Sequence, residues 1–277
     1  MQQAFLFVFL MISAHSQERP SFPTSSADGD STLAAKYAHA VDLFNEHDDS
    51  GEALEEAKTE FMSILTMDPH YAPALAYLGL IVLEGNNTKS ADSLFMLALV
   101  SDSTCAEAHV GRAQLFRQRL QWQAGYDEAH LAVKLAPASA FARWELVNEL
   151  IHRAEAPVTD SIVEETIPHL QKLLEMNHDD REAHLDIAQL YERRKQWQQA
   201  AAHYREVLRI GQTPEDMDVW VYTVHMDASR CFQQYGDYKN AVEDLQYYLQ
   251  AIKEYGADEE EIKNAERQIQ ELEQKNH

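Results

Sequence analysis

The chain of 277 residues has few of the residues that make turns and cross-links. Its 9 glycines and 8 prolines are each about 3% of the sequence, against roughly 7% and 5% in average proteins. A β-sandwich or β-barrel needs a turn every 8–12 residues or so, so this scarcity argues against an all-β fold. Two cysteines are too few for a disulfide framework or a four-thiolate zinc site.

Basic residues are scarce as well. Lysine and arginine total 23 against 46 aspartates and glutamates, which gives a net charge of −23. Nucleic acids and anionic membrane surfaces are bound through basic patches, so neither is an expected partner. The acidic balance favours a partner that is basic or neutral. Hydrophobic residues still make up 45% of the chain, which is enough for a folded core.

The apolar run near the N-terminus is short. Residues 4–12 read AFLFVFLMI, whereas a membrane-spanning helix needs roughly 20 apolar residues. Ala14 and Ser16 follow in the A-x-S form of a signal-peptidase site. We therefore predict a signal peptide over residues 1–16, export to a periplasmic or secreted location, and no stable membrane insertion after cleavage. No lysine or arginine precedes the run, so a frayed apolar terminus and a short membrane anchor are the alternatives.

Residues 17–31 read QERPSFPTSSADGDS, with two prolines, four serines and three acids. This composition cannot bury enough apolar surface to order itself. We expect a flexible leader between the cleavage site and the folded part.

The rest of the chain repeats every 34 residues, as the spacing of Pro69, Ser103 and Pro137 shows. When these residues are placed at position 32 of a unit, three further positions recur at a spacing of four. Position 20 holds mostly small residues, namely Ala57, Ala91, Gly125, Thr166, Ala200 and Ala241. Position 24 holds Phe61, Phe95, Ala129, Leu170, Tyr204 and Leu245, and position 28 holds Leu65, Leu99, Val133, Leu174, Leu208 and Leu249. Residues four apart share one helical face, so these positions predict a packed helix in every unit.

These columns resemble the tetratricopeptide repeat, which pairs two antiparallel helices in 34 residues. The second unit matches its pattern with Leu78, Gly79, Ala91, Phe95 and Ala98, and the fifth with Ala188, Tyr191, Trp197, Ala200 and Tyr204. The resemblance implies an all-α, right-handed α-solenoid whose first helices line a concave groove.

We count six helix pairs in a solenoid over residues 32–255, at about 38–71, 72–105, 106–139, 140–180, 181–214 and 215–255. The fourth unit is 41 residues long, and its seven extra residues fall at about 154–163. Residues 256–277 are predicted to form a capping helix, because the sparse apolar residues Ile262, Ala265, Ile269 and Leu272 lie at helical spacing.

Motifs for chemistry are missing from the sequence. It has no glycine-rich phosphate loop, no G-x-S-x-G and no H-E-x-x-H. His109 and His184 both occupy position 4 of their units, and we interpret them as histidines of a repeated helix face. We predict no catalytic residue, no metal site and no cofactor, and hence that the protein is not an enzyme. Trp122, Trp197 and Tyr238 share position 17 and are expected to pack the turn between the two helices.

Two single residues invite modification. Asn86 begins the only glycosylation sequon, Asn86-Asn87-Thr88, in the predicted turn of the second unit. Cys105 lies near a predicted loop and is a candidate for oxidation, with a buried free thiol as the alternative.

The resemblance implies a non-catalytic scaffold that binds another protein or peptide in its concave groove. A structural adaptor that oligomerises through terminal or convex surfaces is the alternative. Groove-facing positions 2, 5, 9, 12 and 13 give the candidate peptide-binding residues Val110, Gln114, Arg117, Phe141, Trp144, Asn148, Leu185 and Gln189. Phe141 and Trp144 have a second interpretation, in which they pack against the following unit or the inserted residues.

Overall fold

A computed structural model describes residues 31–46, 51–152, 159–211, 219–254 and 256–276. Within these ranges every regular element is a helix and none is a strand, which confirms the predicted all-α class. The predicted signal peptide and almost all of the leader lie outside the described residues, so both stay predictions.

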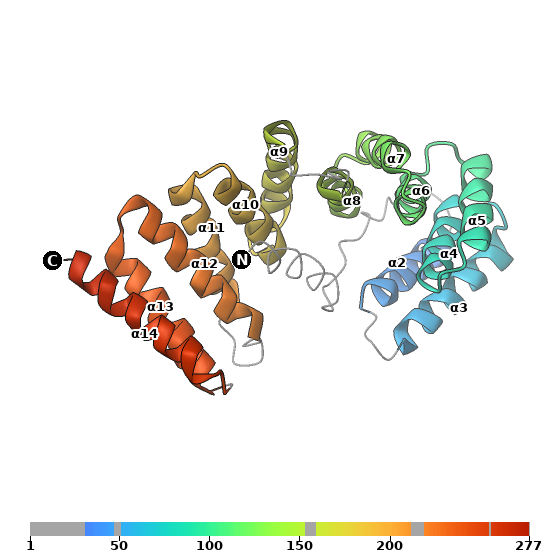
Figure 1. Cartoon of the computed structure of the whole chain (residues 1–277). Coiled ribbons are helices and arrows are strands. Elements are labelled where there is room, and N and C mark those ends of the chain that lie inside the picture. The colour runs from blue at the N-terminus through green and yellow to red at the C-terminus, as the bar shows by residue number, and fades with distance from the viewer. Residues whose placement is uncertain (1–30, 47–50, 153–158, 212–218, 255, 277) are drawn as a thin grey trace. The chain divides into compact units, whose positions relative to one another are not determined.

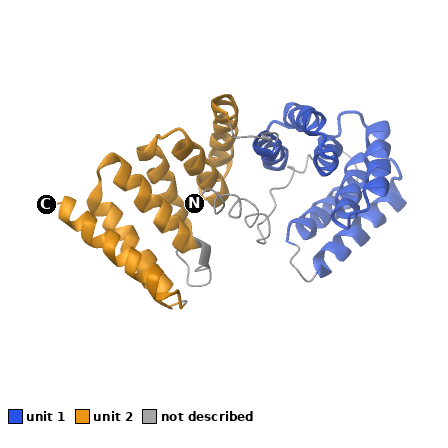
Figure 2. Cartoon of the chain, viewed as in Figure 1, with its two compact units in different colours: residues 1–156 blue, residues 157–277 orange. Residues whose placement is uncertain are grey.

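The chain divides into two compact units, residues 1–156 and 157–277 (Figure 2). The first contains α2 (Ser31–Asn45), α3 (Glu52–Met67), α4 (Ala72–Glu84), α5 (Thr88–Ser101), α6 (Ala106–Gln118), α7 (Trp122–Leu135) and α8 (Ala140–His152). The second contains α9 (Asp160–Met176), α10 (Arg181–Arg193), α11 (Trp197–Ile210), α12 (Val219–Tyr235), α13 (Tyr238–Glu254) and α14 (Glu259–Lys275) (Figure 1). We refer to them as unit 1 and unit 2.

Helices pair in sequence order within each unit. In unit 1, α2 packs on α3, α4 on α5 and α6 on α7; in unit 2, α10 packs on α11 and α12 on α13. The first helices α4, α6 and α8 also contact one another in succession. This stacking is the arrangement that the 34-residue repeat predicts, because a single helix pair cannot bury its apolar face alone.

The turn inside each pair has a fixed construction. Position 15 adopts a left-handed backbone in four units, with φ of 59° at Asn86, 57° at Leu120, 58° at Lys195 and 89° at Gly236. Only glycine adopts this conformation without a steric cost. The second helix then begins at position 17 in all four of these units, at Thr88, Trp122, Trp197 and Tyr238. All three aromatic side chains are half-buried, as expected for residues that pack the turn.

The core of unit 1 is aromatic at its N-terminal end. The Phe61 and Tyr77 rings stack, with centroids 5.0 Å apart and planes 8° apart, and Tyr37 and Phe44 meet Tyr77 edge-on. Each of these four side chains is buried. Rings in these geometries add packing energy beyond the area that they remove from water.

The core of unit 2 ends against a cover helix. On α14, Ala265, Ile269 and Leu272 are buried, Ile262 is half-buried, and the remaining residues are charged or polar and mostly exposed. The helix packs on α13, as the capping prediction requires.

The boundary between the two units falls inside the predicted fourth repeat. Its first helix, α8, belongs to unit 1, and its second helix, α9, belongs to unit 2. Part of the seven-residue excess, residues 153–158, lies outside the described residues. The first predicted pair also starts earlier than residue 38, because α2 begins at Ser31.

Candidate functional site

The candidate groove residues of unit 1 lie on α6 and α8, and two of them are bound to buried acids. Arg117 pairs with both Glu145 and Glu149, its Nη1 donating to Glu149 Oε1 at 2.8 Å. Gln114 Nε2 donates to Glu145 Oε2 at 3.1 Å. The two carboxylates are 2% and 0% exposed. Gln114 and Arg117 therefore join consecutive first helices, and we call these four residues the unit 1 ion cluster.

Burial dominates the electrostatics of this cluster. Desolvation, and then the neighbouring Glu145 carboxylate, raise the pKa of Glu149 to about 8 against the opposing effect of Arg117. Glu149 Oε2 accepts no hydrogen bond from the described part of the chain. The same atom explains the glycine at position 20 of the third unit, since a Cβ on Gly125 would lie 2.5 Å from it.

The sequence contained two signals for this cluster that the column analysis passed over. Glu145 and Glu149 are one helical turn apart on a helix whose other buried residues are apolar except for Arg143. Gly125 also replaces the alanine that most units have at position 20. A smaller residue there indicates a larger side chain opposite it.

The other candidates on these helices differ in exposure. Val110 is completely buried in the hydrophobic core, which favours a packing role, and its place in the groove stays a prediction. Phe141 is 7% exposed and belongs to the same core cluster, and Trp144 is 8% exposed. These values favour the packing interpretation for Phe141. Asn148 is half-buried and remains a groove candidate, as does Trp144.

Unit 2 has a second cluster of this kind, which we call the unit 2 ion cluster. Arg230 of α12 donates through Nε to Glu192 Oε1 of α10 at 2.8 Å, and its Nη2 lies 2.8 Å from Asp227 Oδ1. Tyr204 donates to Glu192 Oε2 at 2.8 Å. The Arg230 side chain is 35% exposed and that of Asp227 is 25% exposed. This cluster is thus open to solvent, whereas the carboxylates of the unit 1 cluster are closed off.

More acids accompany it on α10. Burial raises the pKa of Glu182 to about 7 and that of Asp186 well above its usual range. It also raises the pKa of Asp227, the acid of the cluster on α12, to about 6. The candidates Leu185 and Gln189 lie on the same helix; Leu185 is 8% exposed and Gln189 is half-buried.

A cavity of about 320 Å³ lies further along unit 2, where α14 meets α12 and α13. Its lining includes Met226, at groove position 5, and the acidic residues Asp258, Glu260 and Glu261 of α14. Tyr248 donates to Glu261 Oε1 at 2.7 Å on its wall. The cavity combines an apolar side chain with carboxylates.

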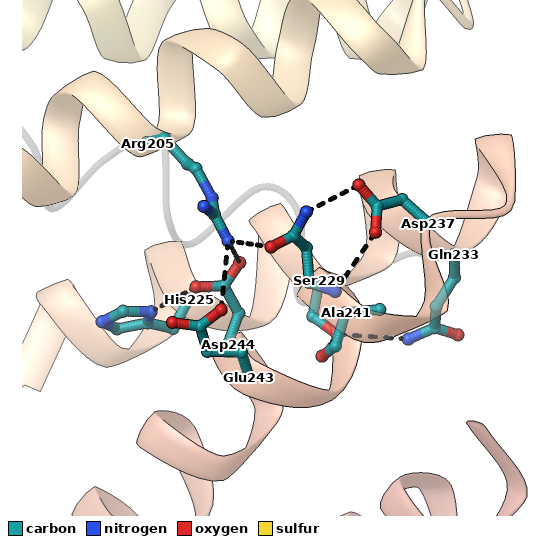
Figure 3. Close-up of polar contacts among 9 residues, drawn as sticks. Arg205, His225, Ser229, Gln233, Asp237, Ala241, Glu243 and Asp244 are labelled. Atoms are coloured by element: carbon teal, nitrogen blue, oxygen red, sulfur yellow. Dashed lines mark hydrogen bonds and ion pairs between the residues drawn. The ribbon is translucent and has the colours of Figure 1, made fainter. Parts of the chain in front are cut away.

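The histidines at position 4 each meet a polar side chain 19 residues later, on the second helix of the same pair. His109 Nδ1 lies 2.6 Å from Glu128 Oε2, and His184 Nδ1 lies 2.9 Å from His203 Nδ1. The interpretation as a repeated helix-face slot holds. The sequence analysis missed that His225 occupies position 4 of the sixth unit, where its Nδ1 lies 3.0 Å from Asp244 Oδ1 (Figure 3).

In the His184–His203 pair the partner of the position 4 histidine is an imidazole instead of a carboxylate. Burial, and then His184, lower the pKa of His203 to about 4, so this imidazole is neutral at pH 7. His184 Nε2 donates to the His178 carbonyl oxygen at 3.2 Å. In the described ranges, no group of three or more histidines, cysteines and acids is arranged to hold a metal ion.

The single residues considered for modification differ in exposure. Asn86 is exposed in the turn between α4 and α5, as predicted, and its glycosylation stays a prediction. Cys105 is 3% exposed, and burial, followed by the Glu107 charge, raises the pKa of its thiol far above the usual range. Its suggested oxidation is therefore disfavoured, since the thiolate is the reactive form. Helices of the length and apolarity required to cross a bilayer do not occur among the described residues.

No family model matches the chain, and no curated protein sequence is significantly similar to it. Solved structures do resemble it. PilF from Pseudomonas aeruginosa superposes with a TM-score of 0.60 at 17% identity, over 85% of this chain and 97% of that one. PilW, a widely conserved type IV pilus biogenesis factor, gives 0.56 at 14% identity, over 85% and 99%. YrrB, a tetratricopeptide-repeat protein with an unusual peptide-binding site, gives 0.54 at 16% identity, over 69% and 91%.

Proposed function

We infer the function from the tetratricopeptide-repeat fold that the chain adopts and from the surface of its first helices. We propose that the protein is a non-catalytic scaffold that binds a basic or neutral peptide or protein segment on this surface in unit 2. The observation that carries the proposal is the set of acidic side chains there: those of the partly exposed unit 2 ion cluster, the half-buried Glu182 and Asp186, and the acids that line the cavity beside α14.

The electrostatics of this surface favour a cationic ligand. Glu182, Asp186 and Asp227 have raised pKa values because burial disfavours their charged forms. A lysine or arginine of a ligand would favour those charged forms, so binding and ionisation support each other. Arg230 is the cation of the cluster, and it is already held by Glu192 and Asp227.

The similar structures are consistent with this proposal. YrrB is described as having a peptide-binding site, and PilW as a biogenesis factor of an assembled pilus. Together with the predicted signal peptide over residues 1–16, they support a role in protein assembly in an exported compartment. Mature protein from the native host should then begin at Gln17, and N-terminal sequencing that finds Met1 would contradict export.

One observation favours the adaptor alternative. The second helices α3 and α5 expose Met62 (55%), Met96 (48%), Leu97 (53%) and Val100 (79%). Met62 and Met96 occupy the same repeat position, 25, so consecutive second helices repeat an exposed apolar residue. Such a surface suits contact with another chain.

Site-specific photo-cross-linking separates the two functions. A benzophenone amino acid replaces Gln189 or Asn148 on the first helices, and Met96 or Val100 on the second helix α5 as matched controls. The scaffold predicts cross-links to a different chain from Gln189 of unit 2 and none from the controls, and a cross-link from Asn148 would extend the binding surface into unit 1. Cross-links from Met96 and Val100 to a second copy of this chain would support the adaptor instead.

Trp144 tests the extent of the groove in unit 1. If it contacts the partner, Trp144→Ala abolishes capture and leaves the melting temperature nearly unchanged. If it packs in the core, the variant loses roughly 3–5 kcal/mol of stability. Thermal melting followed by circular dichroism, run beside the cross-linking assay, decides between the two roles.

A further inference from the structure

A second cavity in unit 2, of about 600 Å³, is lined by α11, α12 and α13. Its lining includes the apolar side chains of Leu208 and Val221 and the polar side chains of Arg205, His225 and Asp244. None of these residues occupies a groove-facing repeat position. The cavity is therefore separate from the surface proposed above, and the inference does not depend on that proposal.

Asp244 is the buried polar group of this cavity. The residue is 4% exposed, and its Oδ1 lies 3.0 Å from His225 Nδ1. Its Oδ2 is buried and accepts no hydrogen bond from any residue that the structure describes. The Nη2 of Arg205 lies 3.8 Å from Oδ2, which is too far for a hydrogen bond (Figure 3). A buried carboxylate oxygen in this state lacks a donor, and supplying one is favourable.

Arg205 covers Asp244 but is held loosely. It reaches from α11 toward α13, where its Nη2 donates to Asn240 Oδ1 at 3.0 Å and lies 3.8 Å from Glu243 (Figure 3). Its side chain is 42% exposed, with the guanidinium 4.7 Å from the centre of the Phe232 ring. Arg205 therefore screens the Asp244 charge without a hydrogen bond to its Oδ2, and a ligand that reaches this oxygen has to displace the Arg205 guanidinium.

The remaining charges of the lining favour a cation over an anion. Glu243 and Glu254 add two carboxylates to that of Asp244. The second arginine of the lining, Arg209, is already engaged by Asp179 and Glu206, each at 2.6 Å. The group that the cavity can best accommodate is thus a positively charged hydrogen-bond donor to Asp244 Oδ2.

The geometry selects the kind of cation. His225 already holds one Asp244 oxygen, so a single acceptor is left, and the two-pronged binding that favours a guanidinium is not available. An ammonium group needs only one strong acceptor. The Tyr247 ring stacks on His225 at 5.0 Å and 19° and is 54% exposed, so it offers an aromatic face to the cation. Leu208 and Val221 provide apolar surface for a methylene chain.

We propose that this cavity binds a lysine side chain presented by a partner protein, whose ammonium group displaces the Arg205 guanidinium and donates a hydrogen bond to Asp244 Oδ2.

The test uses the full chain labelled with ¹³C at histidine Cε1, with the His225 signal assigned from the His225→Gln variant. Nα-acetyl-lysine methylamide is the probe, and Nα-acetyl-norleucine methylamide, which has the same kind of apolar chain without the ammonium, is its control. We expect a saturable shift of the His225 signal with the lysine probe and none with norleucine. Equal shifts with both, or a shift with the corresponding glutamate derivative instead, would overturn the proposal, as would no shift with any probe.

Two substitutions should act in opposite directions. Asp244→Asn should weaken lysine binding roughly tenfold, because a charge-assisted hydrogen bond becomes a neutral one. Arg205→Ala should strengthen it, because the competing cation is gone. Glu164→Gln is the matched control, since it removes an exposed carboxylate of α9 whose partner Arg194 is outside the lining, and it should leave the affinity unchanged.

Circular dichroism establishes that each variant is folded. If Asp244→Asn does not fold, Arg205→Ala and Tyr247→Ala still decide the matter, because both side chains are substantially exposed. Tyr247→Ala should weaken the lysine probe severalfold. Weaker binding in Arg205→Ala would mean that Arg205 is part of the site rather than its cover, and the proposal would be wrong.

Discussion

The two ion clusters both join consecutive first helices, but their side chains differ in how far they are buried. In each, an arginine joins two consecutive first helices through carboxylates, Arg117 in unit 1 and Arg230 in unit 2. The acids of the unit 1 cluster are almost completely buried, whereas Asp227 in unit 2 is a quarter exposed and Arg230 a third. A buried charge depends on its partner, because water cannot replace that partner. The unit 1 cluster is therefore suited to fixing helices, and the unit 2 cluster can exchange its contacts for a ligand.

The largest effect is expected when the arginine of the buried cluster is removed. Arg117→Ala leaves the buried carboxyl groups of Glu145 and Glu149 without their cation, which should cost about 3–5 kcal/mol of unfolding free energy. Urea unfolding followed by circular dichroism measures this loss.

Arg230→Ala is the matched variant in unit 2, and it should cost only about 1–2 kcal/mol, since solvent reaches its partners. Equal losses for the two variants would remove the distinction between a buried and an open cluster.

A second test fills the space beside the buried carboxylate. In Gly125→Ala the new Cβ would lie 2.5 Å from Glu149 Oε2, so the carboxylate has to move, and we expect a cost of about 2 kcal/mol. The double variant Gly125→Ala with Glu149→Ala should lose less than the sum of the two single variants, because the clash is gone. Additive losses in urea unfolding would show that the glycine and the carboxylate are not coupled.

The pH dependence of stability should also distinguish the clusters. The folded pKa of Glu149 is raised from 4.5 to about 8, so the folded state keeps a proton that the unfolded chain has lost between those values. The contribution of Glu149 to stability is full below about pH 4.5, falls as the pH rises through 8, and is then lost. Between pH 5 and 9, we expect the free energy of unfolding of Glu149→Gln to fall by about 1–2 kcal/mol less than that of the unsubstituted protein.

Asp227→Asn is the comparison in unit 2. The pKa of Asp227 is raised from 3.8 to about 6. Its contribution to stability therefore also decreases as the pH rises, and this decrease should end near pH 6. Urea titrations at a series of pH values show both windows, and identical pH profiles for the two variants would contradict the assignment.

The smallest effect concerns the turns. Leu120 in unit 1 has φ of 57° and is 68% exposed, whereas Gly236 in unit 2 occupies the same repeat position with φ of 89°. Leu120→Gly should stabilise the protein by about 0.5 kcal/mol, because glycine adopts the left-handed conformation without strain. Gly236→Leu should destabilise it by about 1 kcal/mol. Thermal melting checks both, and a loss of stability in Leu120→Gly would contradict the strain argument.

The repeat columns were predictable because helix geometry fixes them locally. Residues four apart face the same way whatever surrounds them, so positions 20, 24 and 28 identified buried residues such as Ala57, Phe95 and Tyr204 before any contact was known. Position 17 likewise gave the start of the second helix at Trp122 and Trp197. The C-terminal capping helix was predictable for the same reason, because its few apolar residues lie at helical spacing.

The side-chain partners across helices were not predictable from those columns. Position in the repeat placed Val110, Gln114 and Arg117 on the groove side of α6, but how far each reaches depends on the neighbouring helix. The contacts with α8 bury Glu145 and Glu149 and turn Gln114 and Arg117 into bridges between helices.

The sequence by itself therefore determined the helices, their pairing and the general face that each residue takes, since these follow from a period that short-range geometry imposes. Only the tertiary structure decided which polar residues are buried, because burial depends on the register of helices that are 30 residues apart in the chain. That register brings Arg117 to Glu149, and the packing of α13 on α12 within one pair sets Asp244 beside His225 with one oxygen that accepts no hydrogen bond from the described residues. Both kinds of contact shift the pKa values of the acids by removing them from water.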